Sequence, residues 1–459
     1  MFTHPNCFSS HLPNSRRDFL RATGGGFGSL ALAGLASANP LQPRNGHFAA
    51  RAKRVIFLFM RGGPSQVDTF DYKPKLAEID GKPVSDGSKL KYWKSPWEYK
   101  QRGESGMWIS ELFPNVAKHA DDLCVINSMH TDVGNHPQAV VQMQTGSFQF
   151  ARPSVGSWVT YGLGTENQNL PGFITICPSP AQGGAQNYGS AFLPAACHGT
   201  PILSEGAEIT DDISLPNTAS SEGVEPISRR TLNLAQRLNR ERLKQDGVNP
   251  QLAGLIQSYE LAFRMQTAAP DVMDLKQENE STLAAYGIGT KETDHFGRQC
   301  LLARRFAEAG VRFIQLNTGR WDNHVDLVPI HGELGKATDQ PIAALISDLK
   351  QRGLFEDTLL VWGGEFGRPP YLNTTKGRDH DHLGFTMWMA GGGVKGGINY
   401  GATDEFGHEA VENRVHLHDF HATILHLLGL DHERLTYRYS GREFRLTDVY
   451  GEVVRDILA

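Results

Sequence analysis

The sequence predicts a three-layer α/β fold, with a mostly parallel central sheet and helices on both faces. Short apolar runs recur along the chain, each bounded by glycine or charge, as is typical of parallel strands buried on both faces. Stretches with helical spacing of apolar residues alternate with these runs, which is typical of layered α/β domains. The expected strands are 55–60, 123–127, 173–177, 311–316, 358–362 and 385–390.

Helices are expected between the strands, where apolar residues recur at three- and four-residue spacing. Glycines 146, 310 and 429 each follow such a stretch, and glycine is the usual residue just after a helix. The last helical stripe has apolar residues at 417, 420, 424, 427 and 428. The expected helices are 112–119, 138–144, 227–265, 297–309, 342–352 and 417–428.

The N-terminus has the features of an export signal. Residues 15–20 read SRRDFL, a twin-arginine signature, and an apolar segment follows at 24–34 before Ala36-Ser37-Ala38. That segment is too short for a stable transmembrane helix, and no later stretch is long and apolar enough. We therefore expect a signal peptide over 1–38 and a periplasmic or extracellular protein. Residues 39–459 are expected to form a single domain with a loop-rich insertion around 178–226.

Net charge and cysteine spacing argue against a nucleic-acid-binding surface and against a thiolate zinc site. The net charge is −5 with a pI near 6.4, which does not indicate a nucleic-acid partner. Of the five cysteines, Cys7 lies in the expected signal, and the other four lack the C-x-x-C spacing of a thiolate zinc site. An oxidising compartment permits a disulfide, most plausibly Cys177 with Cys197, although sequence does not assign pairing. Cys124 is expected to be a free, buried residue in a strand.

Acidic, imidazole and guanidinium side chains gather after the predicted strands. Glu365 and Arg368 follow strand 358–362, and the cluster 378–382 (RDHDH) precedes the next strand. Since ligands of open α/β sheets bind at the carboxyl ends of strands, these groups indicate a site there. The alternative is that 379–382 is only a solvated loop. Asp322 and His324 follow strand 311–316 as a plausible metal pair, unless Asp322 merely caps the next helix.

A third cluster lies between strand 123–127 and the helix at 138–144. His130, Asp132, Asn135 and His136 all belong to this one connection. A single histidine there would be interpreted as structural, whereas two histidines with Asp and Asn leave a structural role and a site equally open.

Together these groups suggest a metal centre. Imidazole and carboxylate suit Zn²⁺ or Mn²⁺, and a carboxylate-rich shell tolerates Mg²⁺ or Ca²⁺, so the ion's identity stays open. The expected metal ligands are Asp68, Asp322, His324, Glu365, Asp379, His380 and His382. The expected substrate-binding residues are Arg61 and Arg378, which can hold an anion bidentately. The expected catalytic residues are His136, Asn135 and Arg368.

Several motifs together resemble a known family. They are Gly62-Gly63-Pro64-Ser65 with Asp68 and Asp71, WDNH at 321–324, GEFGR at 364–368, GRDH at 377–380, AGGGVKGG at 390–397, GATD at 401–404, and Asp419, Thr423 and Gly429. On these motifs the chain is identified as a member of domain-of-unknown-function family fifteen-hundred-and-one, which groups exported bacterial proteins within the alkaline phosphatase/sulfatase-like superfamily. The resemblance spans the whole expected mature chain and implies an alkaline phosphatase-like fold.

The superfamily's catalytic pattern is only partly present. His136 stands where the resemblance implies a Ser, Thr or Cys nucleophile, and the Cys/Ser-x-Pro-x-Arg signature of sulfatases is absent. The first strand ends in Met60-Arg61-Gly62 instead of an Asp ligand, and Glu365-Phe366 replaces an Asp-His pair. The resemblance therefore implies a metal-dependent hydrolase of phosphate or sulfate esters with a non-standard site, acting on a small-molecule or glycan ester.

Two other functions stay open. One is a catalytically inactive metal- or glycan-binding module, in which the aromatic residues of 92–108 stack on sugars. The other is a structural exported protein that holds a stabilising ion. The oligomeric state is not indicated by the sequence.

Overall fold

The computed structural model describes residues 41–210, 229–246 and 250–459, and the expected signal peptide at 1–38 lies outside these ranges. Its centre is a nine-stranded sheet with the order β12-β5-β11-β9-β1-β8-β6-β7, and β15 pairs with β5 beside β12. The strands are β1 (Arg54–Met60), β5 (Leu123–His130), β6 (Phe173–Ile176), β7 (Thr200–Ile202), β8 (Phe313–Thr318), β9 (Thr358–Gly363), β11 (Phe385–Ala390), β12 (Ile398–Tyr400) and β15 (Val415–His416).

The sheet is mostly parallel, as predicted, with β11 reversed. Five neighbouring strands run parallel to one another, in the order β9, β1, β8, β6 and β7 across the sheet. Strands β12 and β15 are parallel to β5. By contrast, β11 pairs antiparallel with both β5 and β9. The expectation of a parallel strand at 385–390 is therefore wrong, because an apolar run reports burial on both faces and not direction.

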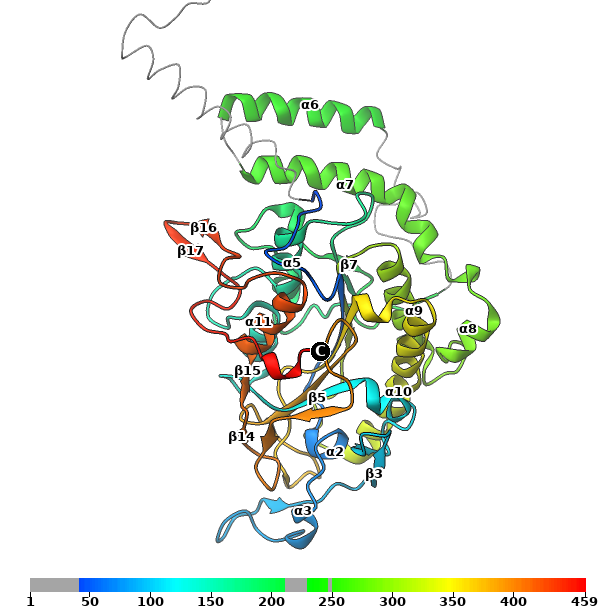
Figure 1. Cartoon of the computed structure of the whole chain (residues 1–459), viewed down its shortest axis with the longest axis vertical. Coiled ribbons are helices and arrows are strands. Elements are labelled where there is room, and N and C mark those ends of the chain that lie inside the picture. The colour runs from blue at the N-terminus through cyan, green and yellow to red at the C-terminus, as the bar shows by residue number, and fades with distance from the viewer. Residues whose placement is uncertain (1–40, 211–228, 247–249) are drawn as a thin grey trace, which may run out of the picture.

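Helices cover both faces of the sheet, which confirms the layered α/β prediction (Figure 1). Alternate residues of β1 point to opposite faces. Ile56, Leu58 and Met60 pack in one core cluster with residues of α9 and α10, whereas Val55, Phe57 and Phe59 pack in another with α4, α5 and α11. These helices are α4 (His136–Thr145), α5 (Val155–Leu163), α9 (Asp294–Glu308), α10 (Leu327–Gln351) and α11 (Leu417–Leu427).

Helices α6 (Arg229–Asp246) and α7 (Pro250–Met273) form a pair at one end of the molecule (Figure 1). They correspond to the single helical region expected at 227–265. Helix α10 starts much earlier than the expected 342. Proline usually breaks a helix, so the sequence favours a start after Pro341, but in the structure Pro341 lies inside α10. The expected helix 112–119 is a 3₁₀ helix at Val116–Asp122. Three short helices complete the set: α2 (Gln66–Thr69), α3 (Lys75–Glu78) and α8 (Glu280–Ala285).

The described part of the expected insertion, residues 178–210, contributes β7 to the edge of the main sheet. The four cysteines of the described chain are all buried and free, so the expected Cys177–Cys197 disulfide is not formed. Cys124 is buried in β5, as predicted. Among the described helices, none is long and apolar enough to cross a membrane.

Candidate metal centre

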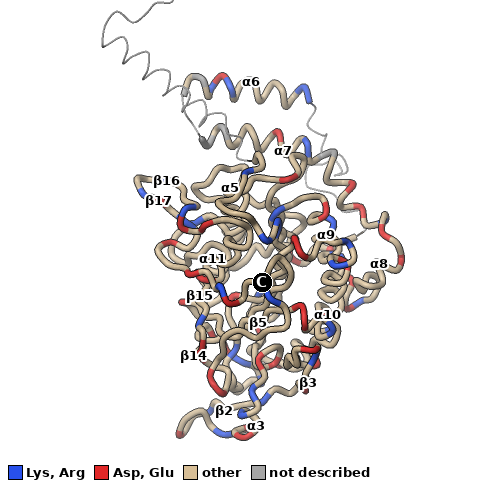
Figure 2. Tube along the Cα trace, in the orientation of Figure 1, with Lys and Arg blue, Asp and Glu red and all other residues tan. Residues whose placement is uncertain are grey.

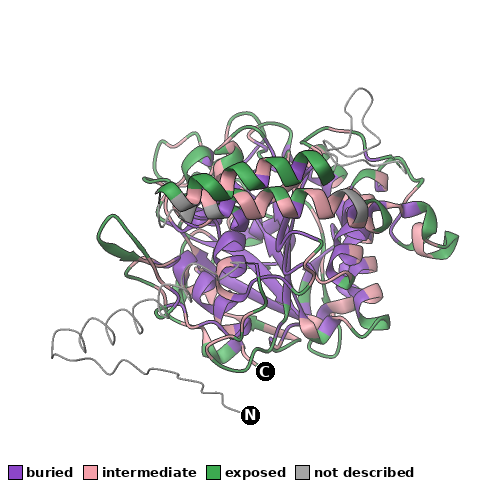
Figure 3. Ribbon diagram, turned by 90° about the horizontal axis from the view of Figure 1, so that it is seen from above, coloured by how far each residue is buried: buried purple, intermediate pink, exposed green. Residues whose placement is uncertain are grey.

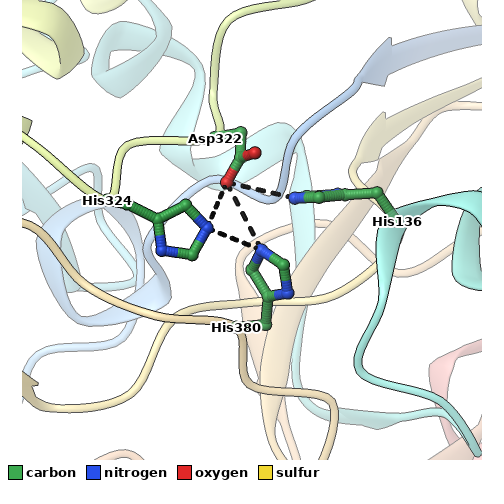
Figure 4. Close-up of side chains that lie close together, drawn as sticks. All are labelled: His136, Asp322, His324 and His380. Carbon is green, nitrogen blue, oxygen red and sulfur yellow. Dashed lines mark hydrogen bonds and ion pairs between the residues drawn. The ribbon is translucent and has the colours of Figure 1, made fainter. Parts of the chain in front are cut away.

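Four side chains meet at the edge of the sheet where β1, β8 and β9 end. Asp322 and His324 follow β8, His136 is the first residue of α4, and His380 comes shortly before β11. Because β11 runs antiparallel to its neighbours, its beginning lies at the same edge as their ends. One ligand atom from each of the four residues lies within 4.8 Å of the other three (Figure 4).

The Nε2 atoms of the three histidines converge on one carboxylate oxygen. Oδ1 of Asp322 lies 3.1 Å from Nε2 of His136, 2.9 Å from that of His324 and 3.4 Å from that of His380. The Nε2 atoms of His324 and His380 are 2.8 Å apart. Three nitrogens and one oxygen therefore surround a common point.

Two of the three imidazoles, those of His136 and His380, are held from behind by a hydrogen bond at their other nitrogen. Nδ1 of His136 lies 2.6 Å from Oε1 of Glu365, and Nδ1 of His380 lies 2.8 Å from the carbonyl oxygen of Gly134. Nδ1 of His324 lies 3.6 Å from Oδ1 of Asp379. A carbonyl and a carboxylate can only accept, so Nδ1 of His136 and of His380 carries the hydrogen, and either ring, when neutral, presents its Nε2 lone pair to the centre. Histidine ligands of metal ions are held in this way.

This donor arrangement fits a divalent cation. The Nε2 atoms of His324 and His380, 2.8 Å apart, either share a hydrogen donated by His324 or face a cation between them. Moreover, Nε2 of His136 is buried and has no hydrogen-bond partner, although it lies within ion-pair distance of Asp322. Three imidazoles and one carboxylate suit Zn²⁺ or Mn²⁺, whereas Mg²⁺ and Ca²⁺ prefer shells of oxygen.

Electrostatics keep the carboxylate of Asp322 ionised. Burial disfavours its charge, but the close contacts with His136 and His380 and the charge of Arg368 hold the pKa of Asp322 well below its ordinary value. Burial likewise opposes the charged form of His136, yet its contacts with Asp322 and Glu365 raise the pKa of His136 above the ordinary value. An anionic ligand with two fixed imidazoles beside it is a strong attractor for a cation.

Arg368 connects Asp322 to the surrounding loops. Its guanidinium is fully buried and donates to Oδ1 of Asp322 at 2.7 Å, to the carbonyl of Gly63 at 3.0 Å and to that of Arg378 at 3.1 Å. It also donates to the carbonyl of Gly62. The expected catalytic residue therefore orients a ligand, and its buried guanidinium does not face solvent.

Four residues that were expected to be metal ligands are not among the four converging residues. Glu365 lies behind His136, where both of its carboxylate oxygens accept from the amide of Gly62 at 3.0 Å. Asp379 lies behind His324, and His382 is not among the four converging residues. Asp68 is fully buried and paired with Arg378, with its Oδ2 2.8 Å from Nε of the arginine.

The residues expected to bind substrate are already paired. Arg378 is wholly buried against Asp68 and stacks on Trp93, with 4.8 Å from its guanidinium carbon to the ring centre. Arg61 donates to Gln182 and forms an ion pair with Glu205. In neither case is the guanidinium presented to a ligand.

Asn135, an expected catalytic residue, caps α4. Its Oδ1 accepts from the amide of Gln138 at 3.3 Å, and this cap sets the start of the helix that carries His136. The nearby Asp132 faces His416 and lies outside the centre. The carbonyl of Gly134, which holds His380, was not identified from sequence, because every residue has such a group.

The centre is open on one side. His136 is almost fully buried, whereas the side chains of Asp322 and His324 are each 38% exposed and that of His380 is 21% exposed. A ligand would therefore approach from the side of His324. No hydroxyl or thiol is among the four converging residues, so the nucleophile that the resemblance implies has no counterpart in this group.

Solved structures match this chain only at very low identity and with low TM-scores. The chain is similar to the sulfatase PsFucS1 from Pseudoalteromonas sp., with 12% identity, 90% of this chain and 72% of that chain covered, and a TM-score of 0.37. It is also similar to a protein of the alkaline phosphatase superfamily from Vibrio parahaemolyticus, with 12% identity, 85% and 70% covered, and a TM-score of 0.33. A likeness of this level does not indicate what the chain binds or converts.

Sequence comparison gives a clearer result. No curated protein sequence matches this chain. A family model described as "Protein of unknown function (DUF1501)" matches residues 52–458, which is nearly the whole described chain. The chain belongs to the DUF1501 family.

Proposed function

We propose that this chain is an exported metalloprotein with a single divalent-ion centre, and that this centre hydrolyses phosphate or sulfate esters. The observation that carries the proposal is the convergence of three histidine Nε2 atoms on Oδ1 of Asp322, with Nδ1 of His136 and of His380 hydrogen-bonded to an oxygen behind the ring. The residues that would hold the ion are His136, Asp322, His324 and His380. When bound, a divalent ion supplies Lewis-acid polarisation of an ester oxygen.

The protein's own residues position the reacting groups. Glu365 and the Gly134 carbonyl fix the rings of His136 and His380, and Arg368 fixes the carboxylate of Asp322. The exposed side at His324 admits the substrate. Since no hydroxyl or thiol is part of the centre, the proposed nucleophile is water.

A metal-binding protein without turnover is the second candidate. It is favoured by the three arginines at 61, 368 and 378, which are all engaged by protein partners and so do not offer a guanidinium to an ester anion. Under this alternative the centre still binds an ion, and only the hydrolytic step is missing.

Metal content and ester hydrolysis separate these candidates. Purified chain is measured by elemental mass spectrometry together with Asp322→Ala and His324→Ala, and with His382→Ala as a control at a neighbouring histidine outside the centre. We expect near-stoichiometric Zn²⁺ or Mn²⁺ in the wild type and the control, and a loss in the two ligand variants. Folded wild type that takes up no divalent ion would refute both candidates. Bound metal without release of phosphate or sulfate from aryl and sugar esters would leave only the second.

A further inference from the structure

Helix α6 has one face packed on the protein and one face turned to solvent. On the inner face Leu232 and Gln236 are buried, and Nε2 of Gln236 donates to the carbonyl of Ile256 in α7 at 2.6 Å. Arg229 at the start of α6 pairs with Glu260 of α7 at 3.1 Å. These contacts fix which side of α6 faces away from the protein (Figure 3).

The outer face carries an exposed leucine pair between arginines. Arg230, Leu234, Leu238 and Arg242 follow one another at four-residue spacing, which places them in one row along the helix. Leu234 is 61% exposed and Leu238 is 64% exposed, and both arginines are exposed. Arg237, three residues after Leu234, flanks the same row.

The helix is strongly basic in an acidic chain. Residues 229–246 contain six Lys or Arg and two Asp or Glu, a net charge of +4, whereas the whole chain carries −5 (Figure 2). The remainder of the chain is therefore at −9. Positive charge concentrated beside exposed leucines on one helix needs an anionic partner that also accepts apolar side chains.

We propose that the outer face of α6 docks the protein on the surface of an anionic lipid membrane. An amphipathic helix with leucines on one row and arginines beside them lies in the interface of such a membrane, with its apolar side chains inserted between headgroups. Two leucines supply only a small part of the surface that each side of a stable protein interface buries, which is about 800 Å². A nucleic acid would use the arginines but would leave the leucines in water. This docking does not depend on the metal centre.

The test is sedimentation of the full chain with vesicles of phosphatidylglycerol and phosphatidylcholine, compared with vesicles of phosphatidylcholine alone. One variant, R230Q/R237Q, removes charge, and another, L234S/L238S, removes the apolar pair. The control R438Q/V449S changes an exposed arginine and an exposed valine elsewhere. The expected signal segment is present in every variant, so differences report α6, and circular dichroism checks that each variant is folded.

We expect the wild type and the control to bind the anionic vesicles, and added salt to weaken this binding. R230Q/R237Q should bind about thirtyfold more weakly, because each basic residue near an anionic surface contributes roughly fivefold. L234S/L238S should lose at least about tenfold. Equal binding of all variants, or equal binding to neutral vesicles, would overturn the proposal. So would a wild-type dimer in ultracentrifugation that is lost in both α6 variants while vesicle binding is unchanged, because the partner would then be a second copy of the chain.

Discussion

Replacing Glu365 by Gln tests whether the carboxylate behind His136 sets the state of that ring. Glu365 is fully buried, with Oε1 2.6 Å from Nδ1 of His136 and both oxygens 3.0 Å from the amide of Gly62. Every neighbour of this carboxylate is thus a donor. Glutamine keeps the shape but replaces one acceptor by an NH₂ group, so one contact becomes donor against donor.

The glutamine amide can take two orientations. One lowers the stability of the protein, and the other lowers its affinity for the metal. If the NH₂ group takes the place of Oε2, Oε1 still accepts from His136 and Gly62, but the buried NH₂ group faces the Gly62 amide without an acceptor, which costs about 1–3 kcal/mol of stability. If it faces His136, Nδ1 must become the acceptor, and the hydrogen moves to Nε2, where it blocks metal binding. Loss of a carboxylate partner behind a histidine ligand lowers metal affinity about 10- to 100-fold, or roughly 1.4–2.7 kcal/mol.

Metal affinity is measured by competition with a chelating dye, and stability of the metal-free protein by urea unfolding. Glu412→Gln, at an exposed position in β14 (Ala410–Glu412), is the matched control and should change neither quantity. A Glu365→Gln protein that is folded and binds Zn²⁺ and Mn²⁺ as tightly as the wild type would show that this contact does not orient His136 for a metal.

Three further predictions concern the centre and its surroundings. His380→Ala should lose its metal in elemental analysis, whereas His382→Ala should retain it; loss in both would mean that the cluster is larger than the four converging residues. Asp68→Asn should lower the urea-unfolding free energy by roughly 3–5 kcal/mol, because the charge of Arg378 stays buried without a counter-charge, and an unchanged midpoint would contradict this. Burial lowers the pKa of His421 to about 3, from 6.5 when exposed. Below pH 6.5 the unfolded state therefore binds a proton at His421 that the folded state does not bind. The free energy of unfolding should consequently be about 2 kcal/mol lower at pH 5 than at pH 7. His421→Gln should remove this part of the pH dependence of unfolding.

Apolar runs located the strands of the core well. Strand 385–390 was predicted with its observed bounds, and the run at 55–60 falls within one residue of β1. Strands β7, β12 and β15 were not predicted, because they have only two or three residues and lie at or beside the sheet edges, partly exposed. Such strands form because a neighbour offers free backbone groups, and this leaves no periodic pattern in their own sequence.

Residue type singled out the residues that converge in the structure but did not assign their roles. Asp322, His324 and His380 were predicted as ligands because they stand between strands that share an edge. The carboxylates of Glu365 and Asp68 have the same chemistry as that of Asp322, so sequence cannot distinguish a ligand from a carboxylate that holds a histidine or neutralises a buried arginine. Only the distances separate these roles: 2.6 Å to Nδ1 of His136 for Glu365 and 2.8 Å to Arg378 for Asp68.

The reversed strand β11 explains why the centre can be assembled at all. In a fully parallel sheet, residues just before a strand lie at the edge opposite to the residues that follow one. His380 comes five residues before β11, and Asp322 comes four residues after β8. They meet because β11 runs against β9, which brings its beginning to the edge where β8 ends. The same reversal lets the backbone of 381 pair with that of 367, in the loop after β9, at 2.8 and 2.9 Å. The position of His380 is thus set by backbone pairing next to Arg368, the residue that holds Asp322, so one loop fixes two of the four converging residues.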